Sequence, residues 1–409
     1  MLLGLLLPSI AFGADIGIEN LDVKGYVSLF AYQSSSNQFD EQHSDRGSWK
    51  KSSVGALLSY RITDNISAKL FTTSLEPIDY GFIQYKLPDN YVLDGIRVGR
   101  VNRLSGVFGG FGVQADKMNF LPQSTSPNRI GRTFFRFDGI QLFKTWSYGE
   151  SMVHLEYTAG NPIIDDSGGV FDPTFYAVFD AKNTEVTSDL VHVVNFNYFY
   201  RGFQFFADYI TTHIDFDTVY KANVSADFLE SLLGLPANTI PEGQYPISES
   251  VSVTDYKIYT VKTGVAQAFG DIELIATYFL QVGVMSPETD FSIGQNSLGN
   301  RFSPEAFTIM SRILTNDNDI LYFGITQFKS DFDNTTIASA GVDAPDWVDY
   351  GQGAFIGYSY LFKKTYPQIN TVGEFQHNRG GSYLSATYQD PLTSRRVWNV
   401  LSASLNMYW

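Results

Sequence analysis

The chain carries a two-residue alternation of apolar and polar side chains that recurs along most of its length. In residues 54–62 every second position is apolar or aromatic, and Ser59 and Arg61 lie between them. Residues 66–73 and 272–281 repeat the pattern. Successive side chains of a strand point to opposite faces, and membrane-spanning barrel strands place apolar side chains outward and small or polar ones inward. The alternation therefore predicts an all-β fold, a transmembrane antiparallel β-barrel.

A soluble β-sandwich alternates in the same way, so the connections decide between the two folds. Short turns at residues 63–65, 147–149, 201–202, 269–271, 316–319 and 363–367 alternate with long polar segments at 161–187, 215–252, 286–303 and 331–349. Outer-membrane barrels have short periplasmic turns and longer external loops. A sandwich has no reason to keep every second connection short. The connections therefore favour an outer-membrane barrel.

Counting the alternating segments predicts about sixteen strands. Because this number is even, both chain ends are expected on the periplasmic side. We place them near residues 23–33, 52–62, 65–75, 80–87, 93–103, 132–146, 150–160, 188–200, 203–214, 253–268, 271–284, 304–315, 319–331, 350–362, 368–378 and 395–409. Fourteen or eighteen strands stay open as alternatives, because residues 382–389 could form another strand. A short helix is expected at 222–233, inside an external loop.

Composition agrees with a barrel. Aromatic residues make up 15% of the chain and charged residues 17%, whereas a soluble domain carries roughly 25% charged residues. There is no cysteine, which excludes disulfides and thiolate metal sites, and no apolar stretch is long enough for a spanning helix. Residues 1–13 predict a signal peptide, truncated at its start because no basic segment precedes its apolar part. Residues 14–409 then form a single barrel domain.

One segment differs in charge from everything around it. Residues 97–136 hold seven basic side chains and one acid, Asp116; the basic ones are Arg97, Arg100, Arg103, Lys117, Arg129, Arg132 and Arg136. The whole chain has 28 basic and 43 acidic residues, so 21 basic and 42 acidic ones remain elsewhere. Strand parity places Arg97 inward and Arg100 outward. A cationic segment thus lies inside an anionic protein of net charge -15.

The same segment resembles the Gram-negative outer-membrane porin superfamily. The resemblance rests on Arg97-Val-Gly-Arg100, Phe120-Leu-Pro-Gln-Ser124 and Asp138-Gly-Ile-Gln-Leu142, about forty-five residues in all, and elsewhere on barrel architecture. It implies a sixteen-stranded barrel whose third loop folds inward and narrows the lumen. Residues 106–112 depart from the pattern because they are glycine-rich. The resemblance also implies a homotrimer, with an interface near residues 23–30 and 397–407.

The resemblance further implies which residues form the pore constriction, namely Arg97, Arg103, Lys117, Arg129, Arg132, Arg136 and Asp116. Rings of Arg or Lys favour anions, because the low-dielectric wall focuses their field on the solute. An alternative is that some of these arginines pair with acids across the lumen or contact lipopolysaccharide phosphates. We predict passive diffusion of small hydrophilic solutes, with a preference for anions as the finer hypothesis.

A second function class stays open. A closed or plugged barrel could serve as a structural or surface-binding protein, such as an adhesin or phage receptor. Phe71, Phe206 and Phe355 are expected to point inward and could make parts of the lumen apolar or occupied. Bilayer conductance separates the two classes.

The last residues carry a further signal. Leu401, Ala403, Leu405, Met407 and Trp409 share one strand face. This pattern resembles the C-terminal strand that outer-membrane proteins present to the barrel assembly machinery, with Trp in place of the usual Phe. We therefore assign Leu405, Met407 and Trp409 as the assembly signal.

Other motifs carry less. Residues 110–115 match the spaced glycines of a dinucleotide site, but Pro122 and polar residues follow where a crossover helix is needed. The five histidines are scattered, and His154 with Glu156 is the nearest acid–base pair. We expect no enzyme activity, no metal, no cofactor and no nucleic-acid partner, while weak calcium binding by acidic external loops stays open. The expected partners are outer-membrane lipid, lipopolysaccharide, the assembly machinery and small solutes.

Overall fold

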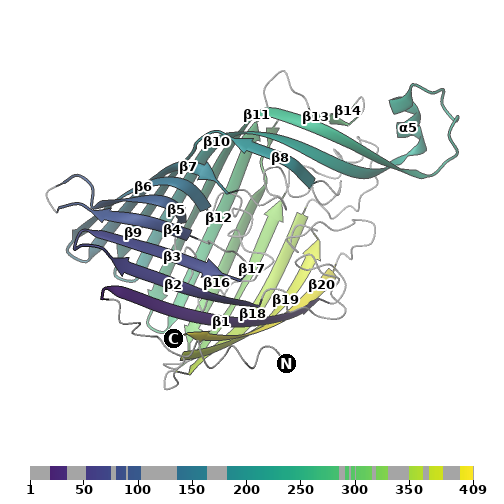
Figure 1. Ribbon diagram of the computed structural model, residues 1–409. Coiled ribbons are helices and arrows are strands. Elements are labelled where there is room, and N and C mark those ends of the chain that lie inside the picture. The colour runs from purple at the N-terminus through teal and green to yellow at the C-terminus, as the bar shows by residue number, and fades with distance from the viewer. Residues whose placement is uncertain are drawn as a thin grey trace, which may run out of the picture.

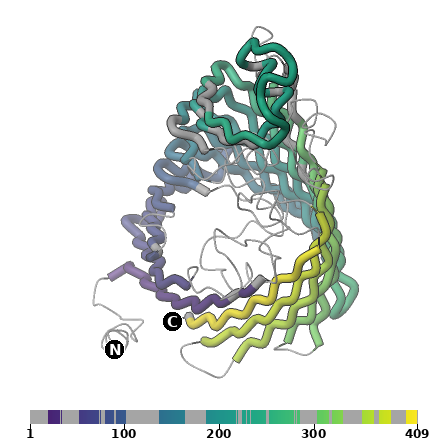
Figure 2. Tube along the Cα trace, turned by 90° about the vertical axis from the view of Figure 1, so that its right-hand side faces the viewer, coloured from purple at the N-terminus to yellow at the C-terminus, as the bar shows by residue number. Residues whose placement is uncertain are grey.

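A computed structural model of the protein describes residues 19–34, 52–74, 80–88, 91–102, 136–163, 182–284, 291–293, 296–299, 301–315, 319–329, 350–362, 368–380 and 397–408. All but two of their strands form one antiparallel sheet that closes on itself (Figure 1). The closure joins the first strand to the last, because Tyr26 lies opposite Tyr408 and Ser34 opposite Val400. Figure 2 shows these two strands side by side, purple against yellow, in a closed ring.

The described residues supply sixteen barrel strands, which confirms the predicted number and fold class. Two of the sixteen are interrupted. β8 and β9 are the two halves of one strand and both pair with β10, and β15 and β16 are the two halves of another and both pair with β12. The strands are β1 (Leu21–Ser34), β2 (Ser53–Arg61), β3 (Ile66–Thr73), β4 (Tyr80–Lys86), β5 (Gly95–Asn102), β6 (Arg136–Tyr148), β7 (Ser151–Pro162), β8 (Lys182–Ser188), β9 (Val191–Tyr200), β10 (Phe203–Ser225), β11 (Gln244–Phe269), β12 (Ile272–Val284), β15 (Arg301–Phe302), β16 (Glu305–Leu314), β17 (Asp319–Lys329), β18 (Tyr350–Phe362), β19 (Gln368–Gly380) and β20 (Val397–Tyr408).

Some sequence-based expectations fall outside the described residues. These are the signal peptide at 1–13, the inward-folded loop between β5 and β6, and the extra strand at 382–389. A small hairpin of β13 (Phe291–Ile293) and β14 (Asn296–Gly299) lies in the segment expected to be a polar loop. No helix among the described residues is long and apolar enough to span a membrane.

The strands have an apolar outer face and a polar inner face. On β6, Ile140 is 48% exposed while its neighbour Gln141 is 1% exposed. On β17, Ile325 is 53% exposed and Thr326 is 2% exposed. The exposed apolar side chains repeat around the sheet and form the band that contacts lipid in membrane barrels. The period-two reading of the sequence is therefore correct strand by strand.

Large aromatic side chains on the inner face lie flat against the wall. Tyr322 of β17 stands directly opposite Gly357 of β18, and Phe355 of β18 stands opposite Gly324 of β17. A side chain at either glycine would clash with the aromatic ring opposite it. A Cβ at Gly357, for example, would lie 2.1 Å from Tyr322 Cζ. The same juxtaposition recurs at Tyr26 with Gly55, Phe206 with Gly264, and Phe143 with Gly95.

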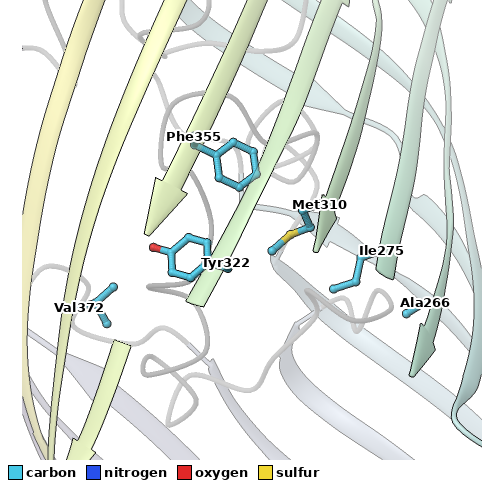
Figure 3. Close-up of a cluster of buried hydrophobic side chains, with 6 residues drawn as sticks. All are labelled: Ala266, Ile275, Met310, Tyr322, Phe355 and Val372. Carbon is cyan, nitrogen blue, oxygen red and sulfur yellow. The ribbon is translucent and has the colours of Figure 1, made fainter. Parts of the chain in front are cut away.

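The three phenylalanines expected to point inward do so. Phe71, Phe206 and Phe355 are 2%, 0% and 4% exposed and lie on the polar-lined face. Tyr322 and Phe355 belong to an inner-wall apolar cluster that crosses six strands (Figure 3); its other members are Ala266, Ile275, Met310 and Val372. Parts of the inner wall are therefore apolar.

The hairpin of β10 and β11 corrects the sequence reading most clearly. Residues 215–252 were expected to form a loop, but ten residue pairs continue the hairpin from Phe216 opposite Val253 to Ser225 opposite Gln244. The β-branched residues on this stretch, including Val224 and Val253, favour an extended strand. We call residues 216–253 the arm; Figure 1 shows it projecting beyond the barrel.

The arm ends in an ordered tip. Its helix α5 (Ala226–Leu233) begins four residues later than the sequence indicated. Gly234, at φ 66°, follows the helix in the left-handed conformation that commonly ends helices. The buried carboxylate of Glu230 accepts hydrogen bonds from the backbone N–H groups of Asn238 (2.9 Å) and Ile240 (2.6 Å). These bonds fix the connection that leads back to β11.

Candidate functional site: the inner wall of the barrel

Five basic side chains share the inner face of the first five strands. They are Lys24 on β1, Arg61 on β2, Lys69 on β3, Lys86 on β4 and Arg97 on β5. In each strand, the basic residue lies an even number of positions from a residue of the inner face. That inner-face residue is either buried itself or paired with a buried residue of the neighbouring strand. All except Arg97 are exposed, and they lie close to the short turns, the periplasmic end of such barrels. We call Lys24, Arg61, Lys69, Lys86 and Arg97 the basic row.

The members of the row are close enough to influence one another. Lys69 interacts electrostatically with both Arg97 and Lys24. One acid offsets part of the charge, because Lys24 Nζ lies 3.4 Å from Asp22 Oδ2 in a pair that is more than half exposed. Exposed pairs of this kind attract weakly and are screened by salt. The row therefore keeps a positive field along this part of the wall.

Arg97 is the buried member, with a side chain 12% exposed. Its Nε donates to Gln84 Oε1 (3.0 Å), and its Nη1 donates to Gln141 Oε1 (2.6 Å) and Glu156 Oε1 (3.1 Å). The guanidinium carbon lies 4.4 Å from the Phe143 ring centroid and 5.5 Å from that of Phe82. Hydrogen bonds, a carboxylate and two rings thus hold Arg97 in the wall.

Glu156 connects Arg97 to a histidine. Its Oε1 also lies 3.1 Å from His154 Nε2, while His154 Nδ1 is 2.8 Å from the hydroxyl of Thr145. The side chain of Glu156 is fully buried. These are the two residues that the sequence indicated as the nearest acid–base pair. Because one carboxylate oxygen is shared between arginine and histidine, the group acts as part of the wall network.

The polar lining continues around the barrel. Asn195 of β9 donates to Asp208 Oδ1 of β10 (2.7 Å), and Lys262 of β11 stands opposite Asp208. Farther along, Tyr322 donates to Glu374 Oε2 (2.7 Å), and Ser28 donates to Asn406 Oδ1 across the closure (2.7 Å). Acids and bases alternate over this part of the wall, whereas the basic row carries one sign.

The described residues place three of the sequence-predicted arginines. Arg97 faces inward and Arg100 lies on the opposite face, as strand parity predicted, where it pairs with Asp138 (2.9 and 3.1 Å). Arg136 begins β6 and has the parity of Asp138 and the outward Ile140. The remaining predicted constriction residues, Arg103, Asp116, Lys117, Arg129 and Arg132, lie outside the described residues.

The predicted assembly strand lies in β20. Leu405 and Met407 are on its outer face and pair with Leu29 and Val27 of β1, while Trp409 lies outside the described residues. In the described part of the chain, no group of three or more His, Asp or Glu side chains is arranged to hold a metal ion.

Sequence reasoning did not assign Lys24, Arg61, Lys69 or Lys86 to the site. Basic residues are dense along the chain only at 97–136, so the charge pattern of the sequence indicates that segment alone. The basic row is dispersed over more than seventy residues and assembles only across strands. The available signal was parity, since Lys69 lies two residues before the inward Phe71 and Lys24 two before the inward Tyr26.

Comparison with known proteins gives the fold a class. No family model matches the chain, and no curated protein matches it. Solved structures do. The outer membrane channel DcaP of Acinetobacter baumannii superposes with a TM-score of 0.53 at 10% identity, covering 98% of this chain and 99% of that one. OmpT, an outer membrane protein of Vibrio cholerae, gives 0.52 at 12% identity, covering 97% and 100%.

A third neighbour is OmpF of Salmonella typhi, solved with daunomycin, at a TM-score of 0.51 and 11% identity over 95% of this chain and 97% of that one. At such identities the likeness concerns the fold. With sixteen strands, an apolar outer band and a polar inner face, the chain has the fold of a porin-like outer-membrane β-barrel.

Proposed function

We propose that the chain is an outer-membrane porin that lets small hydrophilic solutes diffuse passively, and that it favours anions. The observation that carries the proposal is the polar inner face of a closed sheet, with the basic row concentrated on one part of it. A low-dielectric wall focuses the field of such charges on a passing solute. The proposal includes no enzymatic step.

In this proposal the exposed lysines of the basic row contribute more to the selectivity than Arg97 does. Arg97 is paired with Glu156, so its charge is largely balanced. Lys24, Lys69 and Lys86 are exposed on the inner face and are the stronger contributors. The predicted contribution of Arg103, Lys117, Arg129 and Arg132 stays part of the proposal.

Planar-bilayer recording tests the proposal. The purified protein is expected to form stable conducting pores, with a reversal potential in a KCl gradient on the chloride side. A variant with Lys24, Lys69 and Lys86 all changed to Gln is expected to move that potential toward the potassium side. Lys257→Gln is the matched control, because Lys257 lies between the inward residues Tyr256 and Ile258 and so faces outward. Cation selectivity in the wild type would overturn the proposed anion preference, whereas the proposed pore function would still stand.

A second candidate is a closed barrel that acts as a surface-binding protein. The buried aromatic side chains of the inner wall and the arm favour it. Residues 216–253 carry five acidic side chains and one basic side chain, so the arm has a net negative charge. Absence of conductance from folded, heat-modifiable protein would favour this candidate over the porin.

The proposed assembly is a homotrimer in contact with lipid and lipopolysaccharide, reached through the barrel assembly machinery. Its expected interface, near residues 23–30 and 397–407, coincides with the closure of β1 on β20. Chemical cross-linking in mild detergent tests it, with a trimeric band as the expected result and a monomer alone as the contrary one.

A further inference from the structure

Two arginine–carboxylate pairs lie three residues apart on β5, on opposite faces of the sheet. Arg97 pairs with Glu156 on the inner face, and Arg100 pairs with Asp138 on the outer face. The inner pair is enclosed, with side chains 12% and 0% exposed, whereas the outer pair is 29% and 51% exposed. The inner pair is therefore the one whose charge balance reaches the lumen with little screening by water.

Glu156 is placed to cancel the charge of Arg97. It comes from β7, two strands away from β5, and reaches across β6 to the guanidinium. Gln84 and Gln141 already hold the arginine by hydrogen bonds, and Phe82 and Phe143 already enclose it. What Glu156 adds, beyond one more hydrogen bond, is a negative charge.

We propose that Glu156 sets the ion selectivity of the lumen by neutralising Arg97. Removal of the Glu156 charge leaves a net positive charge on the wall beside Lys69, and the channel becomes more anion-selective. Removal of the Arg97 charge leaves a negative one, and the channel shifts toward cations. Glu156 is a selectivity-determining residue that acts through Arg97. The inference rests on the proposed pore function.

The test uses three variants of the full-length protein, namely Glu156→Gln, Arg97→Gln and the double variant. Glutamine keeps the length of Glu156 and an amide oxygen that can accept from Arg97. A unit charge about 8 Å from the path of an ion changes the local concentration of that ion about twofold even in bulk water. Because the concentration of one ion sign rises about twofold while that of the other falls about twofold, each single change should move the anion-to-cation permeability ratio about fourfold. The two single changes should move it in opposite directions. The double variant should return to the wild-type ratio.

Asp138→Asn is the matched control, since it removes a carboxylate from an arginine of the same strand on the outer face. Its permeability ratio should equal that of the wild type. Arg97→Lys keeps the charge without the fork of hydrogen bonds, so its ratio should also stay close to the wild type. A merely structural role for Glu156 would lower heat-modifiable barrel and leave the ratio of the remaining channels unchanged.

The outcomes separate this inference from the proposed function. If neither the wild-type protein nor any variant conducts, the proposed pore function is wrong. If all conduct and Glu156→Gln leaves the ratio unchanged, or if Asp138→Asn moves it equally, the inference is overturned and the pore stands. Should Glu156→Gln fail to insert, Arg97→Gln decides alone, since a shift toward cations supports the inference and an unchanged ratio refutes it.

Discussion

Replacing Gly357 by alanine tests how the inner aromatic side chains are held against the wall. An added Cβ would lie 2.1 Å from Cζ and 2.2 Å from the hydroxyl oxygen of Tyr322. The Tyr322 ring is fully buried, and its hydroxyl donates to Glu374 Oε2 at 2.7 Å. The ring therefore has to leave the wall, lose this hydrogen bond and project into the lumen.

The cost can be estimated from the two interactions involved. Overpacking of a close contact costs about 1–3 kcal/mol, and a hydrogen bond to a charged group contributes about 1.5–3 kcal/mol. Because water in the lumen can replace part of that bond, we expect a loss of about 2–4 kcal/mol in the free energy of unfolding. Urea unfolding in detergent measures this loss, and single-channel recording measures the accompanying fall in conductance.

Gly373 on the next strand is the matched control. A Cβ there meets nothing within 4 Å, and neither glycine has a positive φ, so alanine suits both backbones. Gly373→Ala should leave stability within about 0.5 kcal/mol of the wild type. In a Tyr322→Ala background, Gly357→Ala should lose most of its effect, which a double-mutant cycle detects. Wild-type stability and conductance in Gly357→Ala would refute the reasoning. So would a loss of stability from Gly357→Ala that is as large in the Tyr322→Ala background as in the wild type.

Three further predictions follow from other contacts. Partial burial acts to raise the pKa of Asp94, but hydrogen bonds from Lys144 Nζ and the Thr145 backbone N–H outweigh it and hold the pKa below its usual value. Asp94→Asn should therefore cost about 1 kcal/mol above about pH 4, and the difference from the wild type should vanish as the pH falls below that value, as acid titration of stability will show. Deleting residues 216–253 should leave conductance and heat-modifiability intact, because twelve β10–β11 pairs remain below the arm; loss of the barrel would contradict this. Deleting Trp409 should sharply lower the inserted fraction measured by heat-modifiability, whereas a normal amount would show that the terminal aromatic is incidental.

The barrel could be predicted from the sequence because each strand repeats the same local rule. Outward Ile140 beside inward Gln141, and outward Ile325 beside inward Thr326, need only period-two parity. The same parity placed Arg97 and Arg100 on opposite faces, and the structure agrees. The sequence of a single strand is therefore enough to predict which of its side chains face inward and which face outward.

The partners of the site residues could not be predicted in the same way. The contact of Arg97 with Glu156 spans 59 residues and depends on the register of three strands. A shift of one residue in either register would turn one partner to the outer face. Parity alone therefore identifies Arg97 as inward without showing that its charge is balanced.

The arm was missed for a different reason. Its residues include serines and acids that are typical of loops, and the pairing shifts at the root, where β11 bulges. Between the pairs Ile214–Tyr256 and Phe216–Val253, β11 has two residues and β10 has one. Such a shift changes the phase of the alternation, so the strand pattern looks as if it ends. The Asp215 carboxylate accepts the backbone N–H of Asp255 at 2.7 Å, which stabilises the change of phase.

The hairpin has two parts of unequal stability, one below this bulge and one above Val219. Below the bulge, β10 and β11 have neighbours on both sides in a closed sheet, and their amide protons can exchange with solvent only when the barrel opens. Above Val219, the described residues of β10 pair with β11 alone, as in an isolated two-stranded ribbon, which is marginally stable in water. The arm can thus unfold and refold many times during the lifetime of one folded barrel. Native-state hydrogen exchange would record two separate protection levels along the same pair of strands, and a protease would cut the arm while the barrel remained whole.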